Sequence, residues 1–283
     1  MILFFEYGRL GNQLFQYVGL KKHFPNDSLI FFGCEELHQC FDNVDARFIC
    51  KNTISRRIPF GLLKKIIFFL ANVRILGRII EDSNSNRFNL IVRKGLLPGI
   101  FVPQNVFFQH HDVVEYIEDN PVLKPELLKL AKHWLKSKDM SLSKEQLVFV
   151  HIRRGDYLTW PSPEFPAVLN LEWYCRAMDK ITKQVKNPVF LILSDDPYYV
   201  QDVFSDNPKV IISNNSQNVD LALMSLCSNG ILSASSFAWW GAFYARSGSA
   251  DNVTFIAPKY WGGHRSKKWY PKNFISEWIT YKE

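Results

Sequence analysis

The sequence has few cysteines, and their spacing provides neither a metal site nor a disulfide framework. Only five of the 283 residues are cysteine, which is an odd number, and no CxxC pair occurs. Structural zinc sites and small disulfide-stapled folds depend on such pairs. We therefore expect free thiols in a reducing compartment, and no bound metal.

Long hydrophobic runs are missing as well. The apolar residues 2–5 are too short for the hydrophobic segment of a signal peptide, and no run of about eighteen uninterrupted apolar residues exists. We expect a cytoplasmic protein that is soluble or bound peripherally to the inner face of a membrane.

Charge of one sign never forms a long block. The net charge is +7, yet no five lysines or arginines follow one another. A modest positive excess suits an anionic partner, such as a nucleotide diphosphate or a membrane surface. Because no nucleic-acid motif accompanies it, we expect no nucleic-acid partner.

The common glycine-rich phosphate loops are also absent. Residues 2–5 predict a buried strand and residues 12–22 a helix, and the turn Tyr7-Gly8-Arg9-Leu10-Gly11-Asn12-Gln13 joins them. This turn fits neither GxGxxG nor a Walker loop. The amides of Asn12 and Gln13 suit an acceptor sugar, but the spacing alone identifies no ligand.

The second half of the chain alternates short apolar runs with amphipathic segments. The apolar runs predict five strands, at residues 147–152, 189–193, 210–212, 230–232 and 253–256. The segments between them predict four helices, at residues 171–185, 196–204, 219–227 and 237–246. This alternation predicts a parallel sheet with helices on both faces, which binds ligands beyond the carboxyl ends of its strands.

The first half is less regular, because short aromatic runs alternate there with prolines. Residues 125–138 predict a helix, and the polar residues 137–144 predict the boundary between a domain of residues 1–140 and one of residues 141–283. Residues 62–80 predict a basic amphipathic helix followed by a strand or a second helix. Two interpretations of that segment stay open: a solvated helix packed on the core, or a foot on the anionic inner membrane surface.

Two adjacent arginines close the predicted strand at residues 147–152. Guanidinium groups match phosphate oxygens and keep their charge at all working pH values, so Arg153 and Arg154 can replace a metal ion on a leaving diphosphate. The alternative is a salt-bridge cluster with Asp156 as the internal partner. Gly155 favours a ligand, because it lets the backbone turn tightly beside one.

Two more polar clusters follow later strands. Asp195 and Asp196 come after the strand at residues 189–193, where a carboxylate either accepts from ribose and guanine or caps the next helix. We assign Asp195 to the ligand and Asp196 to the cap. Ser235 and Ser236 open the helix at residues 237–246, where N–H and O–H groups suit either a phosphate or an ordinary cap.

Together these segments resemble the inverting α-1,2-fucosyltransferases of glycosyltransferase family 11, above all the bacterial members that build surface polysaccharide such as O-antigen. The likeness rests on GRLGNQLFQY at residues 8–17, HxRRxDY at residues 151–157 and SSFAWWGA at residues 235–242. The order and spacing match from residue 8 to about residue 262. Arg9 departs from the pattern, since many members have glycine there.

The resemblance implies a fold, a donor and an acceptor. The fold is an α/β, GT-B-like variant with two Rossmann-type halves, in which the acceptor side is N-terminal and the parallel-sheet C-terminal half binds the nucleotide. The donor is GDP-fucose, and the acceptor is an oligosaccharide or lipid-linked glycan that is fucosylated at galactose O2. The resemblance implies no metal and no other cofactor.

The resemblance also assigns roles to residues of these motifs. Four residues take catalytic positions, Arg153, Arg154, Asp156 and Asn12. Seven others take substrate contacts, His151, Asp195, Ser235, Ser236, Phe237, Gly11 and Gln13. Arg153 contacts the β-phosphate with support from Arg154, His151 lies near the ribose, and Asp195 lies near guanine.

Two rival functions stay open at this point. The first is a non-catalytic GDP-sugar or glycan-binding protein, which would keep the phosphate site and show no turnover. The second is a fucosyltransferase of another linkage, such as α-1,6, because the arginine motif is shared with such enzymes. The motifs identify no general base.

Overall fold

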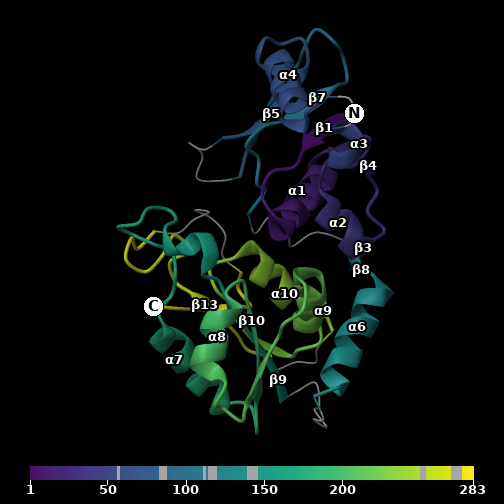
Figure 1. Ribbon diagram of the computed structural model, residues 1–283. Coiled ribbons are helices and arrows are strands. Elements are labelled where there is room, and N and C mark those ends of the chain that lie inside the picture. Colours follow the sequence, from purple (N-terminus) through teal and green to yellow (C-terminus); the bar gives the residue numbers. More distant parts are fainter. Residues whose placement is uncertain are drawn as a thin grey trace. The chain divides into compact units, whose positions relative to one another are not determined.

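The chain folds into two compact units, Met1–Leu123 and Lys124–Glu283, and each unit has its own six-stranded sheet (Figure 1). The structure is a computed structural model that describes residues 1–55, 58–82, 88–110, 113, 120–138, 146–248, 253–268 and 276–283. None of the helices in these ranges is long and apolar enough to cross a membrane.

The first unit is built on a mainly parallel sheet. Its strands run in the order β4 (Arg47–Ile49), β2 (Leu29–Phe32), β1 (Ile2–Phe5), β7 (Phe101–Pro103), β5 (Gly77–Glu81) and β6 (Leu90–Arg93). Only β5 and β6 pair antiparallel within it. The shorter elements are α2 (Glu35–Cys40), α3 (Lys51–Ser55), and the antiparallel pair β3 (Phe41–Asp42) and β8 (Val122–Leu123).

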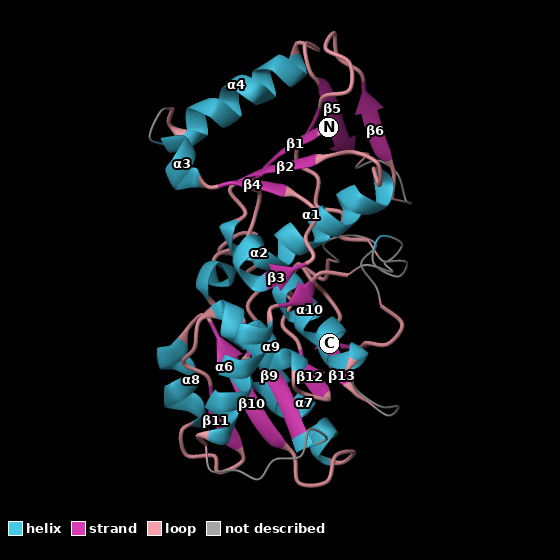
Figure 2. Ribbon diagram, turned by 90° about the vertical axis from the view of Figure 1, so that its right-hand side faces the viewer, coloured by secondary structure: helices cyan, strands magenta, loops and turns pink. Residues whose placement is uncertain are grey.

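Two helices cover opposite faces of this sheet, α1 (Leu10–His23) and α4 (Phe60–Asn72) (Figure 2). The alternation of side chains along β1 explains the arrangement. Phe5 points to α4 and meets Phe68 edge-on at a centroid distance of 5.9 Å. Phe4 points the other way and contacts Phe31, whose ring meets Tyr17 of α1.

The second unit is built on an all-parallel sheet. Its strands run in the order β11 (Val210–Ile212), β10 (Val189–Ser194), β9 (Leu147–Ile152), β12 (Asn229–Ile231), β13 (Phe255–Pro258) and β14 (Thr280–Lys282). Its helices are α6 (Pro125–Lys136), α7 (Leu171–Thr182), α8 (Pro197–Phe204), α9 (Gln217–Ser225) and α10 (Ser236–Ser247). Every residue of β9 is buried, as expected for a central strand covered on both faces.

The strand order of the second unit reverses between β9 and β12. Counted along the chain from β9, the order is third, second, first, fourth, fifth, sixth, which is the doubly wound nucleotide-binding arrangement. The two central strands run in register, with Val150 opposite Ile231. Their carboxyl ends therefore open side by side at the topological switch point, where such sheets bind ligands.

The sequence predictions hold best in the second unit. Residues 147–152 and 210–212 form strands with the predicted bounds, and the other predicted strands and helices occur with ends shifted by a few residues. Strand β14 was not predicted. In the first unit the strand at residues 2–5 is confirmed, and the basic segment at residues 62–80 is helix α4 followed by strand β5.

The division between the units differs from the predicted one. The first unit ends at Leu123, so helix α6 belongs to the second unit rather than to a domain of residues 1–140. The physical reason is that α6 packs against α9, which places its apolar side on the core of the second unit. The polar residues 139–144, where the boundary was expected, lie outside the described residues.

The close approach of β12 to β9 gives a stability prediction. A Cβ added at Gly230 would collide with the ring of buried Phe149, so Gly230→Ala should lower the free energy of unfolding by about 1 to 3 kcal/mol. A urea titration followed by far-UV circular dichroism measures both variants, because the helices and strands of both units contribute to that signal. Gly61→Ala is the control, because a Cβ there meets nothing within 4 Å and stability should not fall. Equal stability of the two variants would contradict the close packing of β12 on β9.

Candidate functional site

A buried hydrogen bond joins the two strand ends at the switch point. His151 is the fifth residue of β9, and its Nδ1 lies 2.7 Å from Oγ of Ser233, which follows β12. Burial, and next the positive charge of Arg153, lower the pKa of His151 to about 3. The imidazole is therefore neutral at physiological pH. Its ring lies 5.5 Å from that of Phe237, so it also contacts the first turn of α10.

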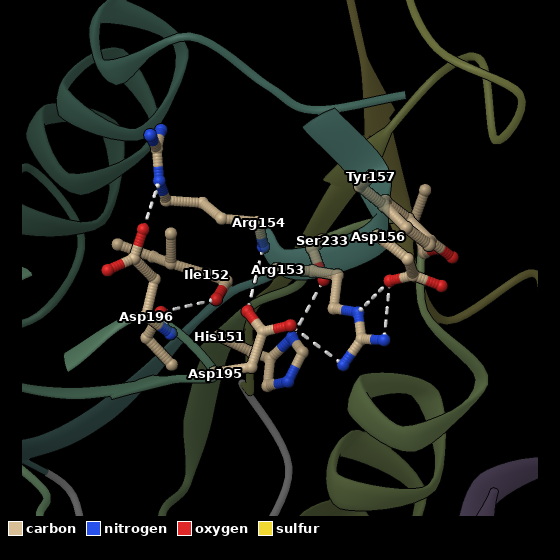
Figure 3. Close-up of polar contacts among 11 residues, drawn as sticks. His151, Ile152, Arg153, Arg154, Asp156, Tyr157, Asp195, Asp196 and Ser233 are labelled. Atoms are coloured by element: carbon tan, nitrogen blue, oxygen red, sulfur yellow. Dashed lines mark hydrogen bonds and ion pairs between the residues drawn. The ribbon is translucent and has the colours of Figure 1, made fainter. Parts of the chain in front are cut away.

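Arg153 turns from the end of β9 into a pair of carboxylates (Figure 3). Its Nε and Nη2 both donate to Oδ1 of Asp156, at 3.0 and 2.6 Å, and its Nη1 lies 2.9 Å from Oδ2 of Asp195. A guanidinium has five N–H groups, so these contacts leave two of them for another acceptor. Its carbon lies 5.5 Å from the centre of the Tyr157 ring.

Arg154 is held separately from Arg153. Its Nε donates to Oδ2 of Asp196 at 2.9 Å, and its guanidinium lies flat over Tyr199 at 3.6 Å from the ring centre. The hydrogen bond from Arg154 lowers the pKa of Asp196. The same carboxylate caps α8, because its Oδ1 accepts from the backbone N–H of Tyr199. The predicted capping role of Asp196 is therefore confirmed.

Asp195 ties both arginines to the end of β10. Its Oδ1 accepts the backbone N–H of Arg154 at 2.8 Å, while its Oδ2 pairs with the Arg153 guanidinium. Gly155 makes this approach possible, since a Cβ there would collide with the Asp195 carboxylate. The structure thus gives Asp195 a positioning role, and its predicted contact with guanine stays a prediction.

The two arginines pair with different carboxylates. Asp156, named from the sequence as the internal partner, pairs with Arg153, and Arg154 pairs with Asp196. Two positive and three negative groups leave the cluster with a net charge of −1. Release of one carboxylate would make the cluster more favourable for an anionic ligand, beyond the N–H groups that the arginines already leave. Asp156 is the easiest to displace, because 61% of its side chain is exposed against 22% for Asp195.

Helix α10 begins beside this cluster. The hydroxyl of Tyr157 donates to the carbonyl of Ala234 at 2.6 Å, which ties the arginine loop to the loop ahead of the helix. Ser235 is the N-cap residue, and within the described chain its side chain makes no capping hydrogen bond to the helix. The first-turn N–H groups at Ser236 and Phe237 carry the positive end of the helix dipole and suit a phosphate.

The glycine turn of the first unit lies at the carboxyl end of β1, where the order of that sheet reverses toward β7. Asn12 lies in the first turn of α1, and its Oδ1 accepts from Nε2 of Gln109, beyond β7, at 2.6 Å. Tyr7 and Phe107, from the same two loops, have ring centres 4.8 Å apart. The turn is thus a second strand-end site, in the unit to which the acceptor was assigned.

Two residues that were predicted to contact the substrate, Gln13 and Gly11, are buried. Gln13 is 1% exposed, and its amide binds the carbonyl of Gly8 and the backbone N–H of Leu37. It therefore holds the glycine turn to α2. Gly11 is buried within α1. The contacts of both residues with an acceptor stay a prediction.

Sequence reasoning missed three side chains that shape the cluster. Ser233 binds His151, Tyr157 binds the loop before α10, and Tyr199 supports Arg154. Tyr157 lay within a recognised motif without a role of its own. Tyr199 follows Asp196 by three residues. An N-cap side chain accepts from the backbone N–H at this spacing, so the sequence could have placed Tyr199 in the first turn of α8, next to the strand end.

The described residues contain no group of three or more His, Cys, Asp and Glu side chains arranged to hold a metal ion. The arginines and the start of α10 are the groups of the second unit that suit a diphosphate.

Comparison with known proteins connects the site to one family. The family model described as "Glycosyl transferase family 11" matches residues 40–282. The O-antigen biosynthesis glycosyltransferase WbnK of Escherichia coli is 26% identical over 92% of this chain and 95% of that protein. An alpha-1,2-colitosyltransferase of Escherichia coli is 26% identical over 90% of each chain. A galactoside alpha-(1,2)-fucosyltransferase 1 of Rattus norvegicus is 27% identical over 47% of this chain and 36% of its own.

Solved structures confirm the predicted fold. The chain is similar to NodZ alpha-1,6-fucosyltransferase co-crystallised with GDP, with a TM-score of 0.51, 13% identity, and coverage of 85% of this chain and 91% of that one. It is also similar to POFUT1 in complex with GDP, with a TM-score of 0.55, 11% identity, and coverage of 90% and 97%. The fold is GT-B-like, with one Rossmann-type sheet in each unit.

The buried histidine gives a prediction on pH. Between pH 6.5 and pH 3 the unfolded chain takes up a proton at His151 that the folded chain does not, so acidification favours unfolding. This group alone should remove about 2 kcal/mol of stability by pH 5, since each pH unit contributes about 1.4 kcal/mol. Urea titrations at pH 7 and pH 5 should show a smaller loss in His151→Gln than in the wild type. Equal losses in the two proteins would contradict a buried, neutral histidine.

Proposed function

The chain belongs to glycosyltransferase family 11, and from this premise we propose that it transfers L-fucose from GDP-β-L-fucose to the 2-hydroxyl of a galactose-containing acceptor, with inversion and without a metal ion. The observation that carries the proposal is the pair of arginines at the switch point of the second sheet. The O-antigen enzyme and the galactoside α-(1,2)-fucosyltransferase among its relatives support surface polysaccharide synthesis and the linkage.

In this proposal the diphosphate of the donor lies between Arg153 and the start of α10. The two remaining N–H groups of Arg153, and those released from Asp156, donate to β-phosphate oxygens. The first-turn N–H groups at Ser236 and Phe237 donate from the opposite side, with the hydroxyls of Ser235 and Ser236 beside them. Asp195 stays bound to Arg153, so the guanidinium remains at the strand end while the phosphate takes the place of Asp156.

The nucleoside is proposed to extend along the carboxyl edge of the same sheet. His151 is neutral and buried, so it presents a hydrogen-bonding ring to the ribose without competing for the phosphate charge. Arg154 faces this edge from its place over Tyr199. Its proposed role is to add positive charge near the phosphates. Asp196 binds it through Nε only, so four other N–H groups remain.

The proposed reaction is a single displacement at the anomeric carbon of fucose. The acceptor oxygen forms a bond to C1 while the bond from C1 to the β-phosphate oxygen breaks, and its electron pair leaves with GDP. The sugar passes through an oxocarbenium-like transition state, so negative charge grows on the β-phosphate. Arg153 stabilises that growing charge more than it stabilises the bound donor. The acceptor proton leaves late and passes to solvent.

The acceptor is proposed to lie at the glycine turn of the first unit, with Asn12 facing it. The amide of Asn12 is oriented by Gln109, whose Nε2 donates to the Asn12 oxygen. An amide does not accept a proton at neutral pH, so Asn12 is a hydrogen-bonding group rather than a base.

The first activity prediction concerns Arg153. Arg153→Ala should lower the rate of transfer by about 10²- to 10³-fold, which is the usual cost of one transition-state donor. Arg153→Lys should also be poor, because an ammonium cannot contact Asp195 and the phosphate with a planar fork. Steady-state rates of GDP release, measured with correctly folded variants, give the comparison. Near-normal turnover of Arg153→Lys would remove the proposed role.

The second activity prediction separates Asp156 from Asp195. If Asp156 is the carboxylate that the donor displaces, Asp156→Asn should bind GDP as tightly as the wild type or more tightly. Asp195→Asn should bind GDP more weakly, because its single amide oxygen cannot accept from both the Arg153 guanidinium and the Arg154 backbone N–H. Isothermal titration calorimetry with GDP measures both. The reverse order of affinities would contradict the exchange.

The proposed function itself is tested with GDP-fucose, lactose and EDTA. Release of GDP together with a 2-linked fucosyl product is the expected result. GDP binding without a product would favour a GDP-sugar-binding protein, and a 6-linked product would favour the other linkage. Activity that fails in EDTA and returns with Mg²⁺ would defeat the metal-independent mechanism. A colitosyl donor belongs in the panel, because one relative is a colitosyltransferase.

A further inference from the structure

Helix α4 of the first unit has an apolar face that no described residue covers. Leu62, Ile66, Phe69 and Val73 follow one another at intervals of four, three and four, so they lie on one side of the helix and its end. Their exposed fractions are 50, 43, 62 and 47%. Exposure of one such residue is ordinary, but four in a continuous stripe are not.

The opposite face of the same helix is already packed. Ile67, Phe68, Leu70 and Ala71 lie against the sheet, where they contact Leu3 and Val102 among others. The helix is therefore apolar on both sides, although only one side meets the core. A helix of this kind is normally buried all round or lies against an apolar surface.

The exposed face continues onto a neighbouring loop. Leu96 and Leu97 are 81 and 48% exposed. Their backbone N–H groups donate to the carbonyls of Arg74 and Ile75 at 2.8 Å each, which fixes the loop to the end of α4. We call the combined surface the α4 patch, and it consists of Leu62, Ile66, Phe69, Val73, Leu96 and Leu97.

Basic side chains border the α4 patch, and acidic ones are missing from its segments. Lys65 on α4, Arg74 at its end, and Arg93 and Lys94 ahead of the leucine loop are all exposed. Residues 58–80 and 88–110 contain no aspartate or glutamate. Lys64 is different, because it turns inward and donates to the carbonyl of Glu6 at 3.1 Å.

We propose that the α4 patch docks the protein on the surface of a bilayer that contains anionic phospholipid. The apolar stripe enters the boundary between headgroups and acyl chains, and the bordering cations meet the lipid phosphates. Helix α4 has 13 residues, about 20 Å, so it lies in the plane of the surface and does not cross it. A second copy of the chain is a poorer occupant, because the cations Lys65, Arg74, Arg93 and Lys94 that border each patch would repel those of the other.

The test is flotation of the purified full chain with vesicles, in a density gradient at low salt. One set of vesicles contains phosphatidylethanolamine with phosphatidylglycerol, and the other contains only phosphatidylcholine. The wild type should float with the first set and remain below with the second. The double variant Leu62→Gln, Phe69→Gln should bind the anionic vesicles about tenfold less, because it removes two large apolar side chains and keeps a helix-forming residue at each position.

Matched variants show whether the loss is specific to the α4 patch. Leu130→Gln is the apolar control, since Leu130 is 55% exposed on helix α6 of the other unit and should float as the wild type does. Lys65→Glu should weaken binding to anionic vesicles about fivefold or more, and added salt should weaken the wild type likewise. All variants should turn over soluble lactose at the wild-type rate in the absence of vesicles.

Three results would overturn the proposal. The wild type could remain below in both gradients, or the double variant could float as well as Leu130→Gln. In the third, the wild type sediments as a dimer that Phe69→Gln converts to a monomer, which would assign the patch to a second copy. Flotation needs neither donor nor acceptor, so its failure is distinct from a failure of the proposed transfer reaction.

Discussion

The contact between Arg153 and Asp195 is the interaction on which the proposed nucleotide site depends. It joins the ends of β9 and β10, and it places a guanidinium beside the switch point rather than in open solvent. Asp195 holds the chain at the same time through the Arg154 backbone N–H, and Gly155 leaves room for it. Pre-positioned charge of this kind costs no reorganisation when the leaving group departs, which is why it favours the transition state.

The remaining contacts of the cluster would let a phosphate take the place of one carboxylate on Arg153. With three carboxylates on two arginines the site is slightly negative as it stands, so it resembles a set of ion pairs more than an open anion site. The exposed Asp156 is the member that water can best accommodate after a phosphate takes its place. Neutral His151 adds no charge that a ligand must displace. The ion pairs of the structural interpretation are therefore compatible with the phosphate-binding role that we propose for the same arginines.

The sequence predicted the second unit well, because its strands are buried on both faces and show as uninterrupted apolar runs such as residues 147–152. The first unit has strands of two to five residues separated by irregular segments, and such short runs carry little periodicity. The burial of Gln13 and the choice of carboxylate by each arginine were not predictable, since both depend on segments distant along the chain. Helix α6 was placed in the wrong domain for the same reason, because its partner α9 lies beyond three strands.

The central claim is that a diphosphate takes the place of Asp156 on Arg153 while Asp195 stays bound. A crystal structure of the protein with GDP, grown in EDTA, measures this most directly. The account predicts Arg153 nitrogens at about 2.7 to 2.9 Å from β-phosphate oxygens, with the Asp195 contact retained and Asp156 turned to solvent. A complex in which GDP lies away from the ends of β9 and β12, with Arg153 still on both aspartates, would contradict it.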